Sequence, residues 1–437
     1  MNQIAPQLES IVSPSSAVSF SRLEVRQRER FQRALAPGET PEVIVYPNSP
    51  EELGAVLQMA SEQNWRVLTC GNGSKIDWGG LVHPVDIIVS TARLNQAIEH
   101  AVDDLTLTVA AGVKFVQIEE MLAGHNQFLA LDPAYPEDAT IGGIVATADT
   151  GSWRQRYGSV RDRLIGISFV RSDGKIVKAG GRVVKNVAGY DLMKLLTGSY
   201  GTLGVISQVT LRLYPLPEAS GTVVLTGSSP AIDKATRTLL NSALTPTAAD
   251  LTCDSEGIKL IARFQSMAES VKQQSERLLE VGQALGLEGI LYSQTDEVNL
   301  WKGLREPIWK SGATAPIICK IGVRPTAAVE ALTFCQKMPA TSIFRAGHAA
   351  LFAGVIHART GLGLLRSDAL RSTQLLEMRS HLASKGGFLT VLSAPVELKQ
   401  KIDVWGYKGN EIEIMRGIKQ QFDPQNILSP HRFVGGM

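Results

Sequence analysis

The chain has 437 residues, a formal net charge of +2 at pH 7 and 20% charged residues. This length predicts more than one domain, and 44% hydrophobic residues are enough to build large cores. The near-neutral balance excludes a basic stripe for nucleic acid, because the arginine cluster at residues 22–33 is interleaved with Glu24 and Glu29, as on a solvated helix face.

Four cysteines are scattered along the chain, at positions 70, 253, 319 and 335. They form no CxxC motif, which excludes an iron–sulfur cluster of the usual ligand pattern and fits a reducing compartment. The first twenty residues lack a basic start followed by an apolar core, and no run reaches the ~18 apolar residues of a membrane span. We expect a cytoplasmic protein with no transmembrane segment, peripheral at a membrane only through partners.

The N-terminal part, residues 1–38, is expected to hold a polar leader and a helix over Arg22–Leu35. Residues 43–47 are typical of a short strand. Ser49 and Glu52 then match a capping box, the pair of side chains that closes a helix start. Apolar residues at helical spacing predict that this helix runs for about three turns.

A glycine-rich loop follows the next predicted strand, residues 66–69. Its sequence is Cys70-Gly-Asn-Gly-Ser-Lys75, and its two glycines let successive backbone N–H groups converge on an anion such as a phosphate. The order Gly-Ser-Lys is not that of a Walker A loop, and residues 76–80 continue as loop where a Rossmann motif needs a helix. The sequence predicts a phosphate-binding loop of neither class, with a plain surface turn as the alternative.

A second glycine-rich segment lies further along the chain. Gly198, Gly201 and Gly204 recur at three-residue spacing just before a β-branched run, Val205–Val209. Because glycine has no Cβ, these residues let a ligand approach the main chain, at a cost of about 0.5–1 kcal/mol each in chain entropy. The pattern predicts ligand contacts through backbone amides, and a tight turn into a strand is the alternative for one or two of the glycines.

Beyond a proline break at residues 214–217, strands and helices follow an order that recurs. Trp301 and Trp309 fall on a predicted helix broken by Pro307, and we interpret them as core or interface residues rather than substrate contacts. The repeated β-α-β-β-α-β order is typical of a ferredoxin-like layered sheet. Strands are predicted at 221–225, 258–264, 317–323, 342–345, 350–356 and 388–392, and helices at 230–242, 267–285, 326–336 and 367–385.

Four motifs in this order resemble a known family. They are the loop at 70–75, Asp132-Pro133 with Ala139-Thr-Ile-Gly-Gly143, Arg156-Tyr-Gly-Ser-Val-Arg-Asp162, and Lys185-Asn-Val-Ala-Gly-Tyr-Asp191 with residues 198–206. Together they resemble the FAD-binding domain of the vanillyl-alcohol oxidase type, and most closely the FAD-binding subunit of glycolate oxidase (glycolate dehydrogenase). The resemblance covers about residues 40–215 and returns at 422–432.

The resemblance implies an α+β fold. It predicts a two-subdomain FAD-binding domain over residues 39–217, a ferredoxin-like α/β cap domain over 218–421 that covers the flavin face in the family, and a C-terminal segment, 422–437, that returns to the FAD domain.

The resemblance also assigns site residues. Lys185, Tyr190 and Arg432 are the polar candidates for a catalytic role beside the flavin, each with a structural role as the alternative. The residues expected to contact FAD are Gly71, Asn72, Gly73, Ser74, Lys75, Asp132, Pro133, Ala139, Thr140, Gly142, Gly143, Thr147, Ala148, Gly151, Tyr157, Gly158, Gly201, Thr202, Leu203, Gly204, Val205 and Ile206. Asp138, Arg161 and Asp162 fit surface ion pairs as well as ligand contacts.

Departures from the family bear on the chemistry. Residues 148–151 differ from its Asn-Ala-Gly-Gly-like run, which leaves flavin contacts there open. No histidine lies between Thr69 and Gly80, and Cys70 precedes the glycines, so we expect FAD to be bound without a covalent link. The Glu-His-Gly segment, which supplies a general base and often metal ligands in catalytic relatives, is absent. His348 and His357 are interpreted as strand or loop residues, and no metal site is predicted.

The leading functional hypothesis is an FAD-binding subunit of a complex that oxidises glycolate or a similar small 2-hydroxyacid. The resemblance implies partners: a second flavin subunit and an iron–sulfur subunit that receives the electrons. Because the segment that bears the base is missing, we expect the isolated chain to oxidise glycolate poorly or not at all. The alternatives are a self-sufficient FAD-dependent hydroxyacid or alcohol oxidase or dehydrogenase, and a non-catalytic assembly subunit that retains the flavin fold.

Overall fold

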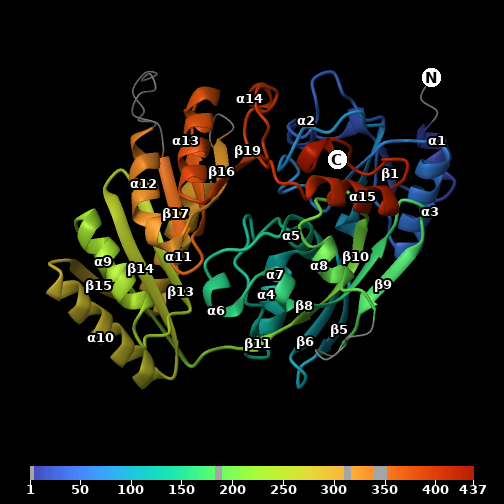
Figure 1. The fold of residues 1–437 in the computed structure, drawn as a ribbon. Coiled ribbons are helices and arrows are strands. Elements are labelled where there is room, and N and C mark those ends of the chain that lie inside the picture. The colour runs from blue at the N-terminus through green and yellow to red at the C-terminus, as the bar shows by residue number, and fades with distance from the viewer. Residues whose placement is uncertain (1–3, 183–188, 310–315, 339–351) are drawn as a thin grey trace. The chain divides into compact units, whose positions relative to one another are not determined.

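The computed structural model describes residues 4–182, 189–309, 316–338 and 352–437. The chain forms two compact units (Figure 1). Unit 1 contains residues 1–151, 158–216 and 407–437, and unit 2 contains 152–157 and 217–406. Lys185, His348 and the predicted strand 342–345 lie outside the described residues.

A four-stranded sheet forms the first half of unit 1, in the order β1 (Ala17–Ser19), β2 (Val43–Val45), β4 (Ile87–Ser90) and β3 (Val67–Cys70). Strands β2, β4 and β3 are parallel, and β1 pairs antiparallel with β2. Helix α3 (Pro50–Glu62) connects β2 to β3 and buries its apolar stripe against the sheet. Helix α1 (Ile4–Glu9) precedes β1, and α2 (Val25–Gln32), which lies between β1 and β2 in the chain, is shorter than the predicted 22–35.

Half of the predicted capping box forms at the start of α3. The Ser49 side chain accepts a hydrogen bond from the Glu52 N–H, but the Glu52 carboxylate accepts from the Asn48 N–H at 2.9 Å and from Ser13 instead of from the Ser49 N–H. Burial, the largest single influence, raises the pKa of Glu52, yet the hydrogen bonds from Ser13 and Asn48 together outweigh it and lower this pKa below 4.5. Glu52 therefore links α3 to the N-terminal segment.

An antiparallel five-stranded sheet forms the second half of unit 1. Its order is β5 (Ala97–Ala101), β6 (Thr106–Ala110), β10 (Val205–Arg212), β8 (Leu164–Val170) and β9 (Ile176–Gly180). Strand β10 contains the predicted run Val205–Val209, which confirms it as a strand. Apolar residues of the sheet and of its helices make one core. The other elements are α4 (Phe115–Ala123), α5 (Ile141–Thr147), α7 (Val160–Arg163) and α8 (Leu192–Leu196), with the short pair β7 (Gln127–Phe128) and β11 (Tyr214–Pro215).

The C-terminal chain packs within unit 1. Helix α15 (Ile412–Phe422) places Ile418 and Phe422 against the core of the five-stranded sheet. Beyond it, the Val67 N–H donates to the Ile427 carbonyl and the Ser429 N–H donates to the Val67 carbonyl, so this segment lies alongside β3. The compact unit accordingly takes in residues 407–421, which were predicted to belong to the cap, because Ile418 of α15 packs, partly buried, against the core of this unit.

Unit 2 contains an antiparallel eight-stranded sheet built from two ferredoxin-like halves. In each half, the β-α-β-β-α-β order gives the strand order 4-1-3-2, and the halves meet where β13 pairs with β17. Helices α9, α10, α12 and α13 pack on one face of the sheet, whereas Trp301 of α11 packs on the other. The first half is β12 (Ala219–Thr226), α9 (Ser229–Leu240), β13 (Ala248–Asp254), β14 (Gly257–Ser266), α10 (Ala268–Ala284) and β15 (Glu288–Ser293). Helix α11 (Gln294–Trp309) follows, then β16 (Ile317–Gly322), α12 (Ala328–Lys337), β17 (Phe352–His357), β18 (Leu362–Ser367), α13 (Ser372–Ser384), β19 (Phe388–Ser393) and α14 (Val396–Lys399).

The recurring pattern predicted from sequence is therefore present, with corrections in detail. Strands β13, β15 and β18 were not predicted, and α13 begins at Ser372 rather than Ser367 because β18 occupies the preceding residues. Helix α11 continues past Pro307 to Trp309, so the predicted break is wrong; Trp301 and Ile308 are both buried, and this packing holds the helix on either side of the proline. Trp301 is buried, as predicted.

Candidate functional site

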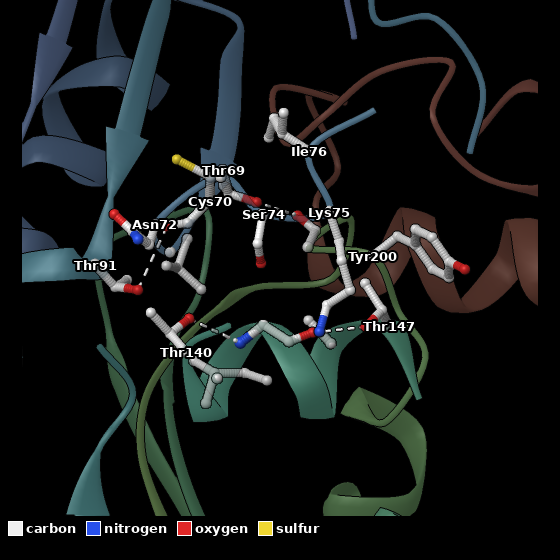
Figure 2. Close-up of a pocket in the computed structure, with 18 of the residues that line it drawn as sticks. Thr69, Cys70, Asn72, Ser74, Lys75, Ile76, Thr91, Thr140, Thr147 and Tyr200 are labelled. Carbon is white, nitrogen blue, oxygen red and sulfur yellow. Dashed lines mark hydrogen bonds between the residues drawn. The ribbon is translucent and has the colours of Figure 1, made fainter. Parts of the chain in front are cut away.

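A pocket lies where the two glycine-rich segments of unit 1 meet (Figure 2). It encloses about 600 Å³ of empty space, counting the part that opens to solvent. Its wall is made by residues 69–76, by Thr91, by α5 with the preceding Thr140, by residues 200, 201 and 204–206, and by Arg432. The side chains of Ser74, Thr91 and Thr140 lie around the same hollow, whereas the Tyr200 ring points away from them.

The glycines hold the two loops at a distance that no other residue permits. A Cβ on Gly71 would overlap the Thr140 hydroxyl, and a Cβ on Gly201 would overlap the Thr69 hydroxyl. Gly73 and Gly201 also have φ angles of +75° and +74°, in the left-handed region that favours glycine. The glycine pattern therefore reflects close approach of three chain segments as well as a turn.

Main-chain donors are uncommitted at this site. Within the described part of the chain, no hydrogen bond uses the backbone N–H groups of residues 71–75, nor those of Gly201 and Gly204. Backbone amides without a protein acceptor require water or a ligand, because an unpaired donor removed from water costs about 1–3 kcal/mol. Successive amides of this kind in a glycine loop form the concave donor set that binds phosphate groups.

The ammonium group of Lys75 is already paired. Lys75 Nζ lies 2.9 Å from Asp149 Oδ2, with 3% and 8% of the two side chains exposed. The same carboxylate oxygen accepts from the Ala134 N–H at 2.9 Å. This buried pair ties the first glycine loop to the segment between β7 and α6 (Arg154–Tyr157) and neutralises the lysine charge within the protein.

The segment after β7 contributes the floor of the pocket through α5. The Thr140 side chain caps this helix by accepting from the Gly143 N–H, and Thr147 Oγ1 donates to the Gly143 carbonyl at 2.7 Å. A Cβ on Gly142 would press against Ala111, so the first turn of α5 packs directly on the chain that follows β6. The Ala139-Thr-Ile-Gly-Gly143 motif thus brings the start of α5 into contact with the first glycine loop, at Gly71, and with the chain after β6, at Ala111.

The C-terminal segment fastens both glycine loops. The buried Arg432 guanidinium donates to the carbonyls of Thr69, Lys75 and Ile76, among others, at 3.3, 3.3 and 2.9 Å. Lys419 Nζ donates to the carbonyl of Thr202 at 2.9 Å and pairs with the buried Asp423. Burial lowers the pKa of Lys419, and Asp423 partly offsets this. Arg432 therefore stabilises the conformation of the first loop by donating hydrogen bonds to its carbonyl groups.

Cys70 lines the pocket at the end of β3. Burial raises the pKa of its thiol to about 12, against smaller lowering effects of a hydrogen bond with Ser90 and the Arg432 charge. A thiol of this kind is protonated at neutral pH and is a poor nucleophile.

The pocket gathers a large part of the residues expected to contact the cofactor. Those that line it are Gly71, Asn72, Gly73, Ser74, Lys75, Thr140, Gly142, Gly143, Thr147, Gly201, Gly204, Val205 and Ile206, together with Arg432. Those that do not are Asp132, Pro133, Ala139, Ala148, Gly151, Tyr157, Gly158, Thr202 and Leu203. Tyr157 belongs to unit 2, and Tyr190, which is 91% exposed, is also absent from the lining.

Six lining residues were not predicted: Thr69, Cys70, Ile76, Thr91, Ala146 and Tyr200. Thr69, Cys70 and Ile76 adjoin the first loop, Tyr200 adjoins Gly201, and Ala146 follows the Gly-Gly pair on the inner face of α5, so extending each motif by a residue or a helical turn would find them. Thr91 has no such signal, because the pairing of β4 with β3 brings it beside Cys70.

The charged side chains that line the pocket are both basic. Lys75 and Arg432 are the charged residues there, and both donate to protein oxygens. No histidine or carboxylate lines the pocket, and no cluster of three or more potential metal ligands occurs in the described ranges. His357, at the end of β17 as predicted, pairs with Asp250 at 2.7 Å in unit 2. In the parts of the chain that the structure describes, no helix combines the length and apolarity needed to span a bilayer.

Comparison with known proteins agrees with this geometry. Residues 41–180 match the family model described as FAD binding domain. The chain is similar to the mitochondrial D-lactate dehydrogenase [cytochrome] of Arabidopsis thaliana, with 26% identity over 72% of this chain and 58% of that protein. It is also similar to glycolate oxidase subunit GlcD of Bacillus subtilis, with 24% identity over 89% and 88%, and to subunit GlcE of Escherichia coli, with 43% identity over 27% and 34%.

The fold is shared with solved structures as well. The structure of p-cresol methylhydroxylase with substrate bound superposes with a TM-score of 0.77, 15% identity, and coverage of 98% of this chain and 95% of that one. Several similarities are partial, since the match to the Arabidopsis protein spans less than two thirds of that relative. The residues at the pocket fit an FAD: amides without protein acceptors suit its diphosphate, and glycines leave room beside the main chain.

Proposed function

We propose that this chain, whose residues 41–180 match an FAD binding domain, binds FAD without a covalent link and serves a complex that oxidises a small 2-hydroxyacid such as glycolate. The observation that carries the proposal is the set of uncommitted backbone amides, residues 71–75 with Gly201 and Gly204, in two loops that meet at one pocket. Such a set binds a diphosphate by hydrogen bonds of about 1.5–3 kcal/mol each.

The proposed division of labour follows from what these residues can do. The glycine loops would hold the diphosphate, and α5 would support the cofactor from below. Arg432 and Lys419 would keep the loops in register by binding their carbonyls. A bound flavin supplies the acceptor for a hydride from the hydroxyacid, and the chain's own contribution is binding and orientation.

The types of side chain that line the pocket support a role within a complex. Oxidation of a hydroxyl group needs a base within hydrogen-bond reach of its proton, and among the described residues that line the pocket there is no histidine or carboxylate. The similarity to GlcE and GlcD supports membership of a glycolate oxidase assembly, where a partner's redox centres, an iron–sulfur subunit in our proposal, would take the electrons. Four free cysteines fit a cytoplasmic location.

Non-covalent binding is supported by the state of Cys70. It is the cysteine that lines the pocket, and its raised pKa of about 12 leaves it almost wholly as thiol, whereas the thiolate is the species that attacks.

The test is the visible spectrum of the purified chain during an anaerobic titration with glycolate, alone and with its partner subunits. We expect a flavin spectrum that glycolate bleaches only when the partners are present. A colourless chain that takes up no added FAD would refute the proposal and favour the non-catalytic assembly subunit.

A second candidate, a self-sufficient D-2-hydroxyacid dehydrogenase, is favoured by the similarity to D-lactate dehydrogenase across 72% of this chain. Fast bleaching of the isolated chain by D-lactate or glycolate would establish that function and exclude dependence on partners.

A further inference from the structure

Strand β15 is an outer strand of the eight-stranded sheet in unit 2, and both of its faces carry exposed apolar side chains. Ile290 is 55% exposed and Leu291 is 45% exposed. They pair with Val224 and Val223 of β12, and because successive side chains of a strand alternate, they point to opposite faces of the sheet. In the described chain, β15 pairs with β12 alone, so its other edge presents backbone N–H and C=O groups.

The other edge of the same sheet is protected by the chain itself. At β19, the Val391 N–H donates to the Val404 carbonyl at 2.8 Å, and Thr390 Oγ1 donates to the Trp405 carbonyl at 3.2 Å. Folded proteins usually guard an exposed edge with proline, lysine, a bulge or a covering segment. The sequence of β15, Glu-Gly-Ile-Leu-Tyr-Ser, has no proline or lysine, and its register with β12 is regular over six residues.

We propose that β15 is a dimerisation edge, on which β15 of a second copy of this chain adds antiparallel about a two-fold axis. In an antiparallel pair, residues that lie opposite each other alternate between hydrogen-bonded and non-hydrogen-bonded pairs. A hydrogen-bonded pair needs residues whose N–H and C=O groups both point away from β12, and every second residue of β15 is of this kind. The two-fold axis therefore lies between one residue near the middle of the strand, either Ile290 or Leu291, and the same residue of the second copy. Either choice places apolar residues against their own copies at the centre.

The charges near β15 are compatible with this self-pairing. The single charged residue of the strand, Glu288, lies opposite Tyr292 when the axis passes through Ile290, and lies beyond the partner strand when it passes through Leu291. It never lies opposite itself. The neighbouring helix α10 exposes both signs of charge, with Lys272, Glu276, Arg277 and Glu280, so two copies side by side do not oppose a surface of one sign.

The adjacent helix extends the apolar surface. Val298 of α11 is 62% exposed, and α11 packs on the face of the sheet to which Ile290 points. Backbone pairing alone supplies affinity without a deep groove, and alternate side chains supply the specificity. A self-matching strand with apolar residues at its centre fits a second copy better than a strand of unrelated sequence.

The test is the oligomeric state of the full-length chain by sedimentation equilibrium between about 1 and 100 μM. We expect a dimer of twice the 47.2 kDa chain mass, and at least a tenfold weaker dimer in Ile290→Lys. The matched control is Ile414→Lys, which changes a side chain that is 66% exposed on α15 of unit 1 and should leave association unchanged. Equal unfolding midpoints of the three proteins would exclude a folding defect.

Cross-linking locates the axis. Facing residues of an antiparallel pair have Cα atoms about 4.5–5.5 Å apart, within the disulfide range. We expect an intermolecular disulfide in Ile290→Cys or Leu291→Cys, and none in Glu269→Cys on α10. A monomer at 100 μM would overturn the proposal, as would a dimer that Ile290→Lys does not weaken. Capture of β15 by a different protein, with no self-association, would also overturn it.

Discussion

Variants of the buried pair of Lys75 and Asp149 can distinguish two modes in which the first glycine loop could bind a diphosphate. If the backbone amides bind it, the lysine charge is dispensable once Asp149 is neutralised as well. If the ammonium group leaves Asp149 and binds the phosphate, removing it weakens FAD binding directly. The two variants Lys75→Met and Lys75→Met/Asp149→Asn distinguish these cases.

The single variant should be strongly destabilised. The two groups are 2.9 Å apart with 3% and 8% of their side chains exposed, so Lys75→Met leaves a buried carboxylate whose remaining hydrogen bond comes from the Ala134 N–H. Breaking a buried pair in this way costs about 3–5 kcal/mol of unfolding free energy. The double variant removes both charges and should recover most of that loss, since the side-chain carbonyl of the substituted asparagine can still accept from the Ala134 N–H.

FAD affinity then reports the binding mode. If the amides hold the diphosphate, the double variant should bind FAD within about threefold of the parent protein. Loss of a charge-assisted bond from Lys75 would instead cost about 1.5–3 kcal/mol, a weakening of roughly 10–150-fold. Affinity is measured by fluorescence titration of the apoprotein with FAD, and stability by urea unfolding.

A surface pair supplies the control. Lys194→Met breaks an ion pair with Asp191 in which 52% and 40% of the side chains are exposed, and it should cost at most about 1 kcal/mol. A double variant that is as stable as the parent yet binds FAD more than tenfold weaker would refute the backbone-amide mode.

Three further variants test local features. Gly201→Ala forces a left-handed φ and overlaps Thr69, so it should cost at least about 1–2 kcal/mol in urea unfolding and weaken FAD binding, whereas Gly303→Ala, with nothing near its Cβ, should do neither. Cys70→Ser should keep the flavin content, and acid precipitation should release FAD from parent and variant alike; flavin retained by the parent pellet would contradict non-covalent binding. Because the folded pKa of Glu52 lies below 4.5, its contribution is complete above that pH and lost as pH falls through the lowered value. Glu52→Gln should cost about 1–2 kcal/mol near pH 7 and converge with the parent as pH falls through the lowered pKa of Glu52, and a gap that widens with acid would contradict this.

Features with a short-range cause were predictable from the sequence. The left-handed φ angles of Gly73 and Gly201 follow from the residue type, and the apolar spacing of α3 follows from helical periodicity. The helices and several strands of the two ferredoxin-like halves were predicted for the same reason. The order of the four motifs along the chain also predicted the α+β fold of a flavoprotein, and the comparisons with known proteins confirm this fold.

Other features depend on which segments pair across long separations. Thr91 reaches the pocket because β4 lies beside β3, Lys75 meets Asp149 74 residues away, and Arg432 reaches carbonyls more than 350 residues earlier in the chain. No sequence pattern in the chain between two such residues predicts that they will be in contact. Strand register and burial select these contacts, because a buried charge or backbone carbonyl is stable only where folding supplies its partner.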